Sequence, residues 1–229
     1  MVWFDPCCSI QPGSQNHYDR MRQVYKGKKG YISEDAKMYN KNLVESDTAV
    51  KQRAEGRRIC WIIVLARGVV HVELMPENWK VNASGLAFFV HKLPQILHSM
   101  LGPQAKLPRK IFTDRGTGMY APTGKIANKY YEAVQNEGFD VYWGPDASRQ
   151  SPDMPDMLLH ETAVSWFRKR MAIEKSVVLP WHETRQQWQH RARTCVRYIN
   201  THYDVAGLCR EFPARVQAVM RKEGDRLPK

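Results

Sequence analysis

Lys110-Ile111-Phe112-Thr113-Asp114 is a short apolar run that ends in a carboxylate, and Arg115-Gly116-Thr117-Gly118 follows it directly. An apolar, β-prone run that stops at a glycine-rich turn is typical of a buried strand. The chain opens on a second such run, Val2-Trp3-Phe4-Asp5, which is followed by Pro6. The sequence therefore predicts two strands, each with an Asp at or near its end.

Strand and helix patterns alternate along most of the chain, which is typical of a mixed α/β fold. Ile59–Leu65 and Val69–Leu74, separated by Arg67-Gly68, predict a hairpin of core strands. The remaining expected elements are a helix capped at 82–84 and running to 101 with a kink or break at Pro94, helices over 124–137, 156–173, 183–200 and 213–223, and a strand over 139–143.

Residues 11–56 differ in character from this pattern. They are rich in Gly, Asn, Ser and Lys, and they contain a basic cluster over 26–30 between two tyrosines. We expect an inserted arm here, with some helix around 34–55. The expected organisation is one domain over 1–175 that contains this arm, followed by a basic helical extension over 176–229 packed on or beside it.

The charge balance points to a polyanionic partner. The chain has 35 Lys and Arg against 23 Asp and Glu, a net charge of +12, and its 43% of hydrophobic residues argues against wholesale disorder. No apolar run approaches the roughly 20 residues that a membrane span needs, and Met1–Asp5 does not resemble a signal peptide. We expect no membrane association and an intracellular protein, in the nucleus if eukaryotic and otherwise in the cytoplasm or nucleoid.

The five cysteines are odd in number and show neither a Cys-x-x-Cys pair nor zinc-finger spacing. This pattern predicts reduced thiols that mostly fill the core, rather than a disulfide framework or a structural zinc site. A bound metal would then need oxygen ligands.

Three carboxylates on separate elements are candidates for such ligands: Asp5, Asp114 and Glu161. Two-metal phosphoryl transfer uses acidic oxygens to hold two Mg²⁺ ions about 3.5–4 Å apart. If the first two strands are neighbours in the sheet, all three acids would meet at one edge. Each Asp taken alone is more often a turn former beside Pro or Gly, so the joint pattern carries the prediction.

Glu161 is expected near the middle of an apolar stripe shared with Met157, Val164 and Met171 on a helical wheel. A carboxylate there is costly unless it has a partner. A metal ion is one such partner, and a salt bridge with Arg168 is the other.

The segments Val2–Asp5, Ile111–Gly116 and Ser151–Pro155, the last followed by Glu161–Lys169, together resemble the DDE/D transposases, most nearly the mariner-like and insertion-sequence group. The resemblance implies an RNase H-like fold in which Asp5, Asp114 and Glu161 are catalytic and bind two Mg²⁺ or Mn²⁺ ions, with no small-molecule cofactor. The implied reaction is hydrolysis of a phosphodiester at a DNA end, followed by attack of the freed 3′-OH on target DNA. The implied partners are DNA and a second copy of the chain.

The chain also departs from the family pattern. The third acid of the family usually lies closer to the Ser-Pro-Asp segment than Glu161 does, so Asp156 is the reserve, whereas Asp146 and Asp153 look like loop caps. Arg115–Gly118 replaces the more usual Asn-containing turn. Family members also carry helix-turn-helix domains before the first catalytic strand. The chain is therefore expected to be a catalytic fragment, a degenerate descendant, or a subunit whose partner recognises the DNA ends.

Positive side chains predict the DNA contacts. The expected phosphate ligands are Lys26, Lys28, Lys29, Arg115, Arg168 and Lys169, and further positive charge lies at Arg185, Arg191, Arg193 and Arg197. Solvated loops and polar helix faces explain many such residues equally well. His71 and His160 are candidates for proton transfer, although a lone histidine is more often structural.

Two alternatives to a strand-transfer enzyme stay open. One is a non-catalytic or domesticated nucleic-acid-binding protein that keeps the RNase H-like fold. The other is an RNase H-like nuclease of repair or RNA processing.

Overall fold

The structure is a computed structural model that describes residues 1–11, 14, 26–27, 30–31, 57–113, 125–141, 159–174, 178–179 and 182–221. Residues 1–7, 60–175 and 189–229 form one compact unit, and residues 8–59 and 176–188 form a second. The expected domain boundary at residue 175 stays a prediction.

A five-stranded mixed sheet carries the core. Its strands are β1 (Val2–Gln11), β4 (Arg57–Ala66), β5 (Val69–Leu74), β6 (Lys110–Thr113) and β7 (Asp140–Val141), in the order β5-β4-β1-β6-β7. β6 is parallel to β1 and to β7, whereas β4 and β5 are antiparallel. The expected mixed α/β class is therefore confirmed.

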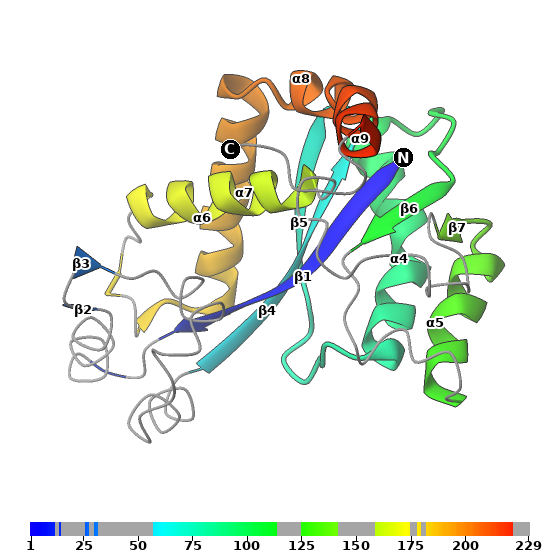
Figure 1. Ribbon diagram of the computed structural model, residues 1–229. Helices are drawn as coiled ribbons and strands as arrows, with labels where there is room; N and C mark the ends of the chain where they lie inside the picture. Colours follow the sequence, from blue (N-terminus) through cyan, green and yellow to red (C-terminus); the bar gives the residue numbers. More distant parts are fainter. Residues whose placement is uncertain are drawn as a thin grey trace. The chain divides into compact units, whose positions relative to one another are not determined.

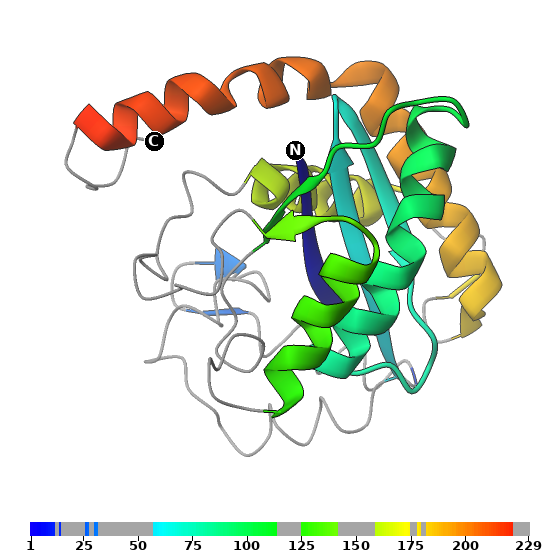
Figure 2. The ribbon, with the colours of Figure 1, turned by 90° about the vertical axis from the view of Figure 1, so that its right-hand side faces the viewer.

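Helices cover both faces of the sheet. The helices of the described residues are α4 (Ala83–Leu101), α5 (Lys125–Asn136), α6 (Leu159–Ile173), α7 (Arg185–His202), α8 (Val205–Arg210) and α9 (Phe212–Arg221). Figures 1 and 2 show α4 and α5 on one face of the sheet and α6 with most of α7 on the other. None of the helices that the described residues form could cross a membrane.

The expected hairpin of core strands is confirmed as β4 and β5. Arg67 and Gly68 connect them with positive φ values of 46° and 81°, the left-handed conformation of a tight hairpin turn. Every β4 residue from Ile59 to Ala66 is buried, because helices cover the strand on both faces.

The helix expected up to residue 101 is also confirmed, and it is not broken at Pro94, where a kink or a break was expected. Asn82 caps α4 by accepting a hydrogen bond from the Gly85 N–H at 2.8 Å, and the helix continues through Pro94 to Leu101. Proline removes one hydrogen bond of the helix ladder. The buried side chains of Leu93 and Leu97 on either side keep the helix packed.

The expectation that the first strand closes at Asp5-Pro6 is wrong as well. β1 runs on to Gln11, so Asp5 lies within the strand rather than at its end. Pro6 lies two residues beyond Phe4, the last β1 residue whose pairing with β6 is described.

Several other expected elements differ at their ends. Residues 156–158 of the helix expected over 156–173 lie outside the described residues, and α6 is described over Leu159–Ile173. A short helix, α8, precedes α9 where only one helix was expected. Two residues of the strand expected over 139–143, Tyr142 and Trp143, lie outside the described residues, as does the helix expected around 34–55. In the second unit, the basic cluster forms a small antiparallel pair of β2 (Lys26–Gly27) and β3 (Gly30–Tyr31).

Aromatic side chains fill the core beside β1. The Trp3 ring contacts the rings of Phe112 on β6 and Phe212 on α9, with centroids 6.4 and 5.3 Å away. The cysteines expected to fill the core do so in three cases: Cys7, Cys60 and Cys195 are buried.

Candidate functional site

Asp5 projects from the middle of the sheet toward one defined face. Successive side chains of a strand point to opposite faces. The Phe4 ring lies 5.1 Å from the Phe89 ring of α4, so Phe4 faces the α4 side. Trp3 and Asp5 therefore share the opposite face, which α6 and most of α7 cover (Figures 1 and 2).

The Asp5 carboxylate is half-buried, and the Cys7 thiol donates a hydrogen bond to its Oδ2 at 3.4 Å. A thiol is a weak donor. A carboxylate oxygen is a hard ligand of the kind that a divalent cation prefers.

β6 runs beside this part of β1. Val2, Trp3 and Phe4 are paired with Ile111, Phe112 and Thr113 in parallel register. Thr113 is 1% exposed, and its hydroxyl has no hydrogen-bond partner within the described part of the chain. The two strands expected to carry Asp5 and Asp114 are therefore neighbours in the sheet, as a site shared by both acids requires.

Glu161 lies in the first turn of α6 and is exposed. The expectation that it occupies the middle of an apolar stripe is wrong. The buried face of the helix is instead formed by His160, Ala163, Val164 and Phe167, at helical spacing. Because Glu161 directly follows His160, it is rotated about 100° out of that face. Its position near the helix N-terminus favours a negative charge.

Side chains of β4 hold α6 against the sheet. The Trp61 ring on β4 lies 4.8 Å from the Phe167 ring, and the Arg168 guanidinium lies 5.9 Å from the Trp61 ring centroid. Arg168 is half-buried, whereas its neighbour Lys169 is exposed. Of these two expected phosphate ligands, Lys169 is the more accessible.

The two candidate histidines differ in environment. His160 is 1% exposed, and neither ring nitrogen has a hydrogen-bond partner in the described structure. Burial lowers the pKa of His160 to about 3, so the ring is neutral at physiological pH. This burial supports the structural reading of His160.

His71, on β5, lies 3.3 Å from the Glu73 carboxylate. That hydrogen bond is the main reason that the pKa of Glu73 is lowered, against the opposing effect of burial. His71 is therefore engaged with a neighbouring acid on the same strand.

Several expected site residues lie outside the described residues: Lys28, Lys29, Asp114, Arg115, Asp156 and the loop caps Asp146 and Asp153. Lys26 is described as the start of β2. Among the described residues alone, no three His, Cys, Asp or Glu side chains are grouped closely enough to hold a metal ion. Of the four candidate metal ligands, only Asp5 and Glu161 are among the described residues.

No known family model matches this chain, and neither does any curated protein. The assignment of a function therefore depends on the geometry and chemistry of the residues themselves.

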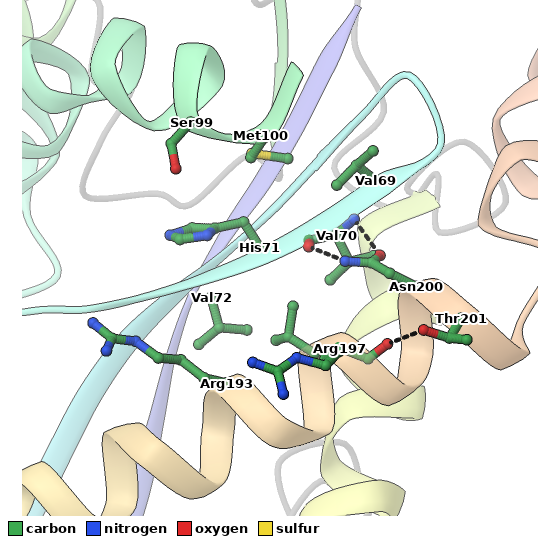
Figure 3. Close-up of a pocket in the computed structure, with 11 residues that line it drawn as sticks. Val69, Val70, His71, Val72, Ser99, Met100, Arg193, Arg197, Asn200 and Thr201 are labelled. Atoms are coloured by element: carbon green, nitrogen blue, oxygen red, sulfur yellow. Dashed lines mark hydrogen bonds between the residues drawn. The ribbon is translucent and has the colours of Figure 1, made fainter. Parts of the chain in front are cut away.

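A pocket of about 520 Å³ beside β5 was not expected from the sequence. Its lining residues come from β5, the end of α4 and the second half of α7 (Figure 3). Arg193 and Arg197 project from α7 at its rim, and Val70 and Val72 lie along the strand. The sequence carries no motif for this pocket, because segments far apart in the chain form it.

Proposed function

We propose that this chain is a metal-dependent DNA strand-cleaving and strand-transfer enzyme with an RNase H-like fold. Asp5, Asp114 and Glu161 are its metal ligands, and Asp156 is the alternative third ligand. One observation carries the proposal: Phe4 on β1 is paired with Thr113 on β6 in parallel register.

The pairing matters because Asp5 follows Phe4 and Asp114 follows Thr113 in the chain. Each acid is therefore bonded directly to one residue of the Phe4–Thr113 pair. In the sequence, 109 positions separate the two acids. Asp5 also lies on the side of the sheet that α6 covers, and α6 carries Glu161 (Figure 1). This arrangement supports convergence of the acids from three separate elements.

The donor chemistry fits a hard divalent cation. Mg²⁺ and Mn²⁺ prefer carboxylate oxygens, and the Asp5 carboxylate is half-buried while Glu161 is exposed in the first turn of α6. When bound, such ions neutralise phosphate charge and activate the attacking oxygen. The fold holds and orients the metal-binding carboxylates. Arg168 and Lys169, on the same helix as Glu161, offer positive charge to the phosphates of DNA.

A nicking assay on duplex DNA with Mg²⁺ or Mn²⁺ tests the proposal. We expect nicking by the wild type and a loss of about 100-fold or more in Asp5→Asn and Asp114→Asn. Asp140→Asn is the matched control, because it makes the same change at an exposed residue of β7. Comparison of Glu161→Gln with Asp156→Asn identifies the third acid.

Equal nicking by the wild type and Asp114→Asn contradicts the proposal. Absence of nicking in every protein, together with salt-sensitive DNA binding that Asp114→Asn leaves unchanged, indicates a non-catalytic nucleic-acid-binding protein instead. The net charge of +12 is compatible with both outcomes.

A further inference from the structure

β5 is an edge strand, and its pairing with β4 shows which of its backbone groups face outward. The Met75 N–H donates to the Cys60 carbonyl at 2.9 Å. In an antiparallel ladder, such hydrogen-bonded pairs alternate with pairs that do not exchange hydrogen bonds. In the register of β4 and β5, Leu65–Val70 and Ile63–Val72 are pairs of the second kind. The N–H and C=O groups of Val70 and Val72 are therefore turned away from β4.

The side chain of Asn200 on α7 already binds one of these outward positions. Its Oδ1 accepts from the Val70 N–H and its Nδ2 donates to the Val70 carbonyl, each at 2.9 Å (Figure 3). A residue of an adjacent strand would bind Val70 with the same donor and acceptor pair. The Asn200 side chain thus makes, at Val70, the two hydrogen bonds that a neighbouring strand would make.

Val72, two residues further along the same edge, lies at the pocket beside β5. Among the described residues no side chain binds its backbone as Asn200 binds that of Val70. The pocket volume of about 520 Å³ is within the range of about 300–1,000 Å³ that ligand sites occupy. Within the described part of the chain, the backbone groups of Val72 therefore have no hydrogen-bond partner, and there is space beside them.

The charge of the pocket is positive on its α7 side. Arg193 and Arg197 are both exposed, lie one helical turn apart on α7, and line the pocket. The Val72 side chain lies between His71 and α7 (Figure 3). Arginine forms paired hydrogen bonds with carboxylates. Val69, Met100 and Val196 supply apolar surface in the same pocket.

We propose that the edge of β5 binds an extended, acidic peptide segment of a partner protein. The segment adds as a strand beside Val72, and its carboxylates bind Arg193 and Arg197. Nucleic acid fits less well, because Val72 presents a donor and an acceptor, whereas a phosphodiester backbone has acceptors but no donor. This proposal does not depend on the metal-dependent activity.

The test uses the full chain and a fluorescein-labelled heptapeptide that alternates Val and Glu, with binding followed by fluorescence anisotropy. We expect saturable binding that the double variant Arg193→Glu, Arg197→Glu weakens by about tenfold or more. The control is Lys106→Glu with Lys129→Glu, which changes net charge equally at exposed residues outside the pocket and is expected to bind as the wild type does.

Backbone recognition is tested with N-methylated peptides. Methylation of one alternating set of peptide nitrogens is expected to abolish binding, and methylation of the other set to preserve it, because only one set faces β5. The Val72 amide resonance is expected to shift when the unmethylated peptide is added.

Equal binding of both methylated peptides overturns the proposal, as does a Val72 amide that does not respond. Absence of peptide binding also overturns it. Arginine-dependent binding of a mixed-sequence oligonucleotide without binding of the peptide would assign the pocket to nucleic acid instead.

Discussion

The Trp61 ring on β4 and the Phe167 ring on α6 lie 4.8 Å apart, and both side chains are buried. This contact joins β4, which lies between β5 and β1 in the sheet, to the helix that carries Glu161. The stability of the fold and the placement of a candidate metal ligand thus depend on the same pair of residues.

Phe167→Ala is expected to lower the free energy of unfolding by about 3–5 kcal/mol, because it leaves a cavity against Trp61. Urea denaturation measures the change. Phe88→Ala on α4 is the control: that ring is 42% exposed, and its loss is expected to cost about 1 kcal/mol or less. Similar losses in the two variants would show that α6 is not packed as described.

His160 is expected to make the protein sensitive to acid. Burial lowers its folded-state pKa to about 3, whereas in the unfolded chain the pKa is about 6.5. Unfolding therefore takes up a proton between these values, and stability that is complete above pH 6.5 is lost as the pH falls toward 3. Between pH 7.5 and 5 we expect the wild type to lose about 2 kcal/mol more than His160→Leu.

The comparison needs denaturation curves of both proteins at each pH. Phe88→Ala, which removes an exposed side chain that does not titrate, is expected to keep the pH dependence of the wild type. If wild type and His160→Leu show parallel pH profiles, His160 is not buried in the neutral form.

Metal binding is expected to stabilise the folded protein independently of any activity. At a Mg²⁺ concentration tenfold above the dissociation constant, the gain is about 1.4 kcal/mol, which raises Tm by about 3–6 °C in a chain of this size. Asp5→Asn and addition of EDTA are expected to abolish the increase, and Asp140→Asn to retain it. An unchanged increase in Asp5→Asn would remove that residue from the metal site.

Gly85→Ala is expected to destabilise α4, although alanine is the better helix former. A Cβ at this position would collide with the Lys80 carbonyl and press on the Trp79 ring, whose Nε1 donates to the Gly85 carbonyl at 2.8 Å. The expected loss is about 2 kcal/mol or more in thermal or urea unfolding. Ser84→Ala, at the adjacent exposed position, is expected to change stability by less than about 0.5 kcal/mol, and an equal effect of both would contradict the close approach.

Local patterns predicted most elements because their causes are local. The hairpin at Arg67-Gly68, the cap at Asn82 and the helix ended near Gly138 depend on turn chemistry and on side-chain periodicity over a few residues. The strand end expected at Asp5-Pro6 and the break considered at Pro94 do not occur, for the opposite reason. The effect of a proline on a strand or helix depends on which neighbours pair or pack with it, and those neighbours are distant in sequence.

The candidate site shows the same division. The amino-acid sequence by itself determined the two runs that end in Asp5 and Asp114, the positive charge, and the mixed α/β class. Only the tertiary structure decided that these runs are adjacent and parallel, that Glu161 is turned out of the core while His160 is turned in, and that the edge of β5 lies beside two arginines. Strand adjacency and helix rotation are chosen by the total burial of apolar side chains from the whole chain, which no single segment specifies.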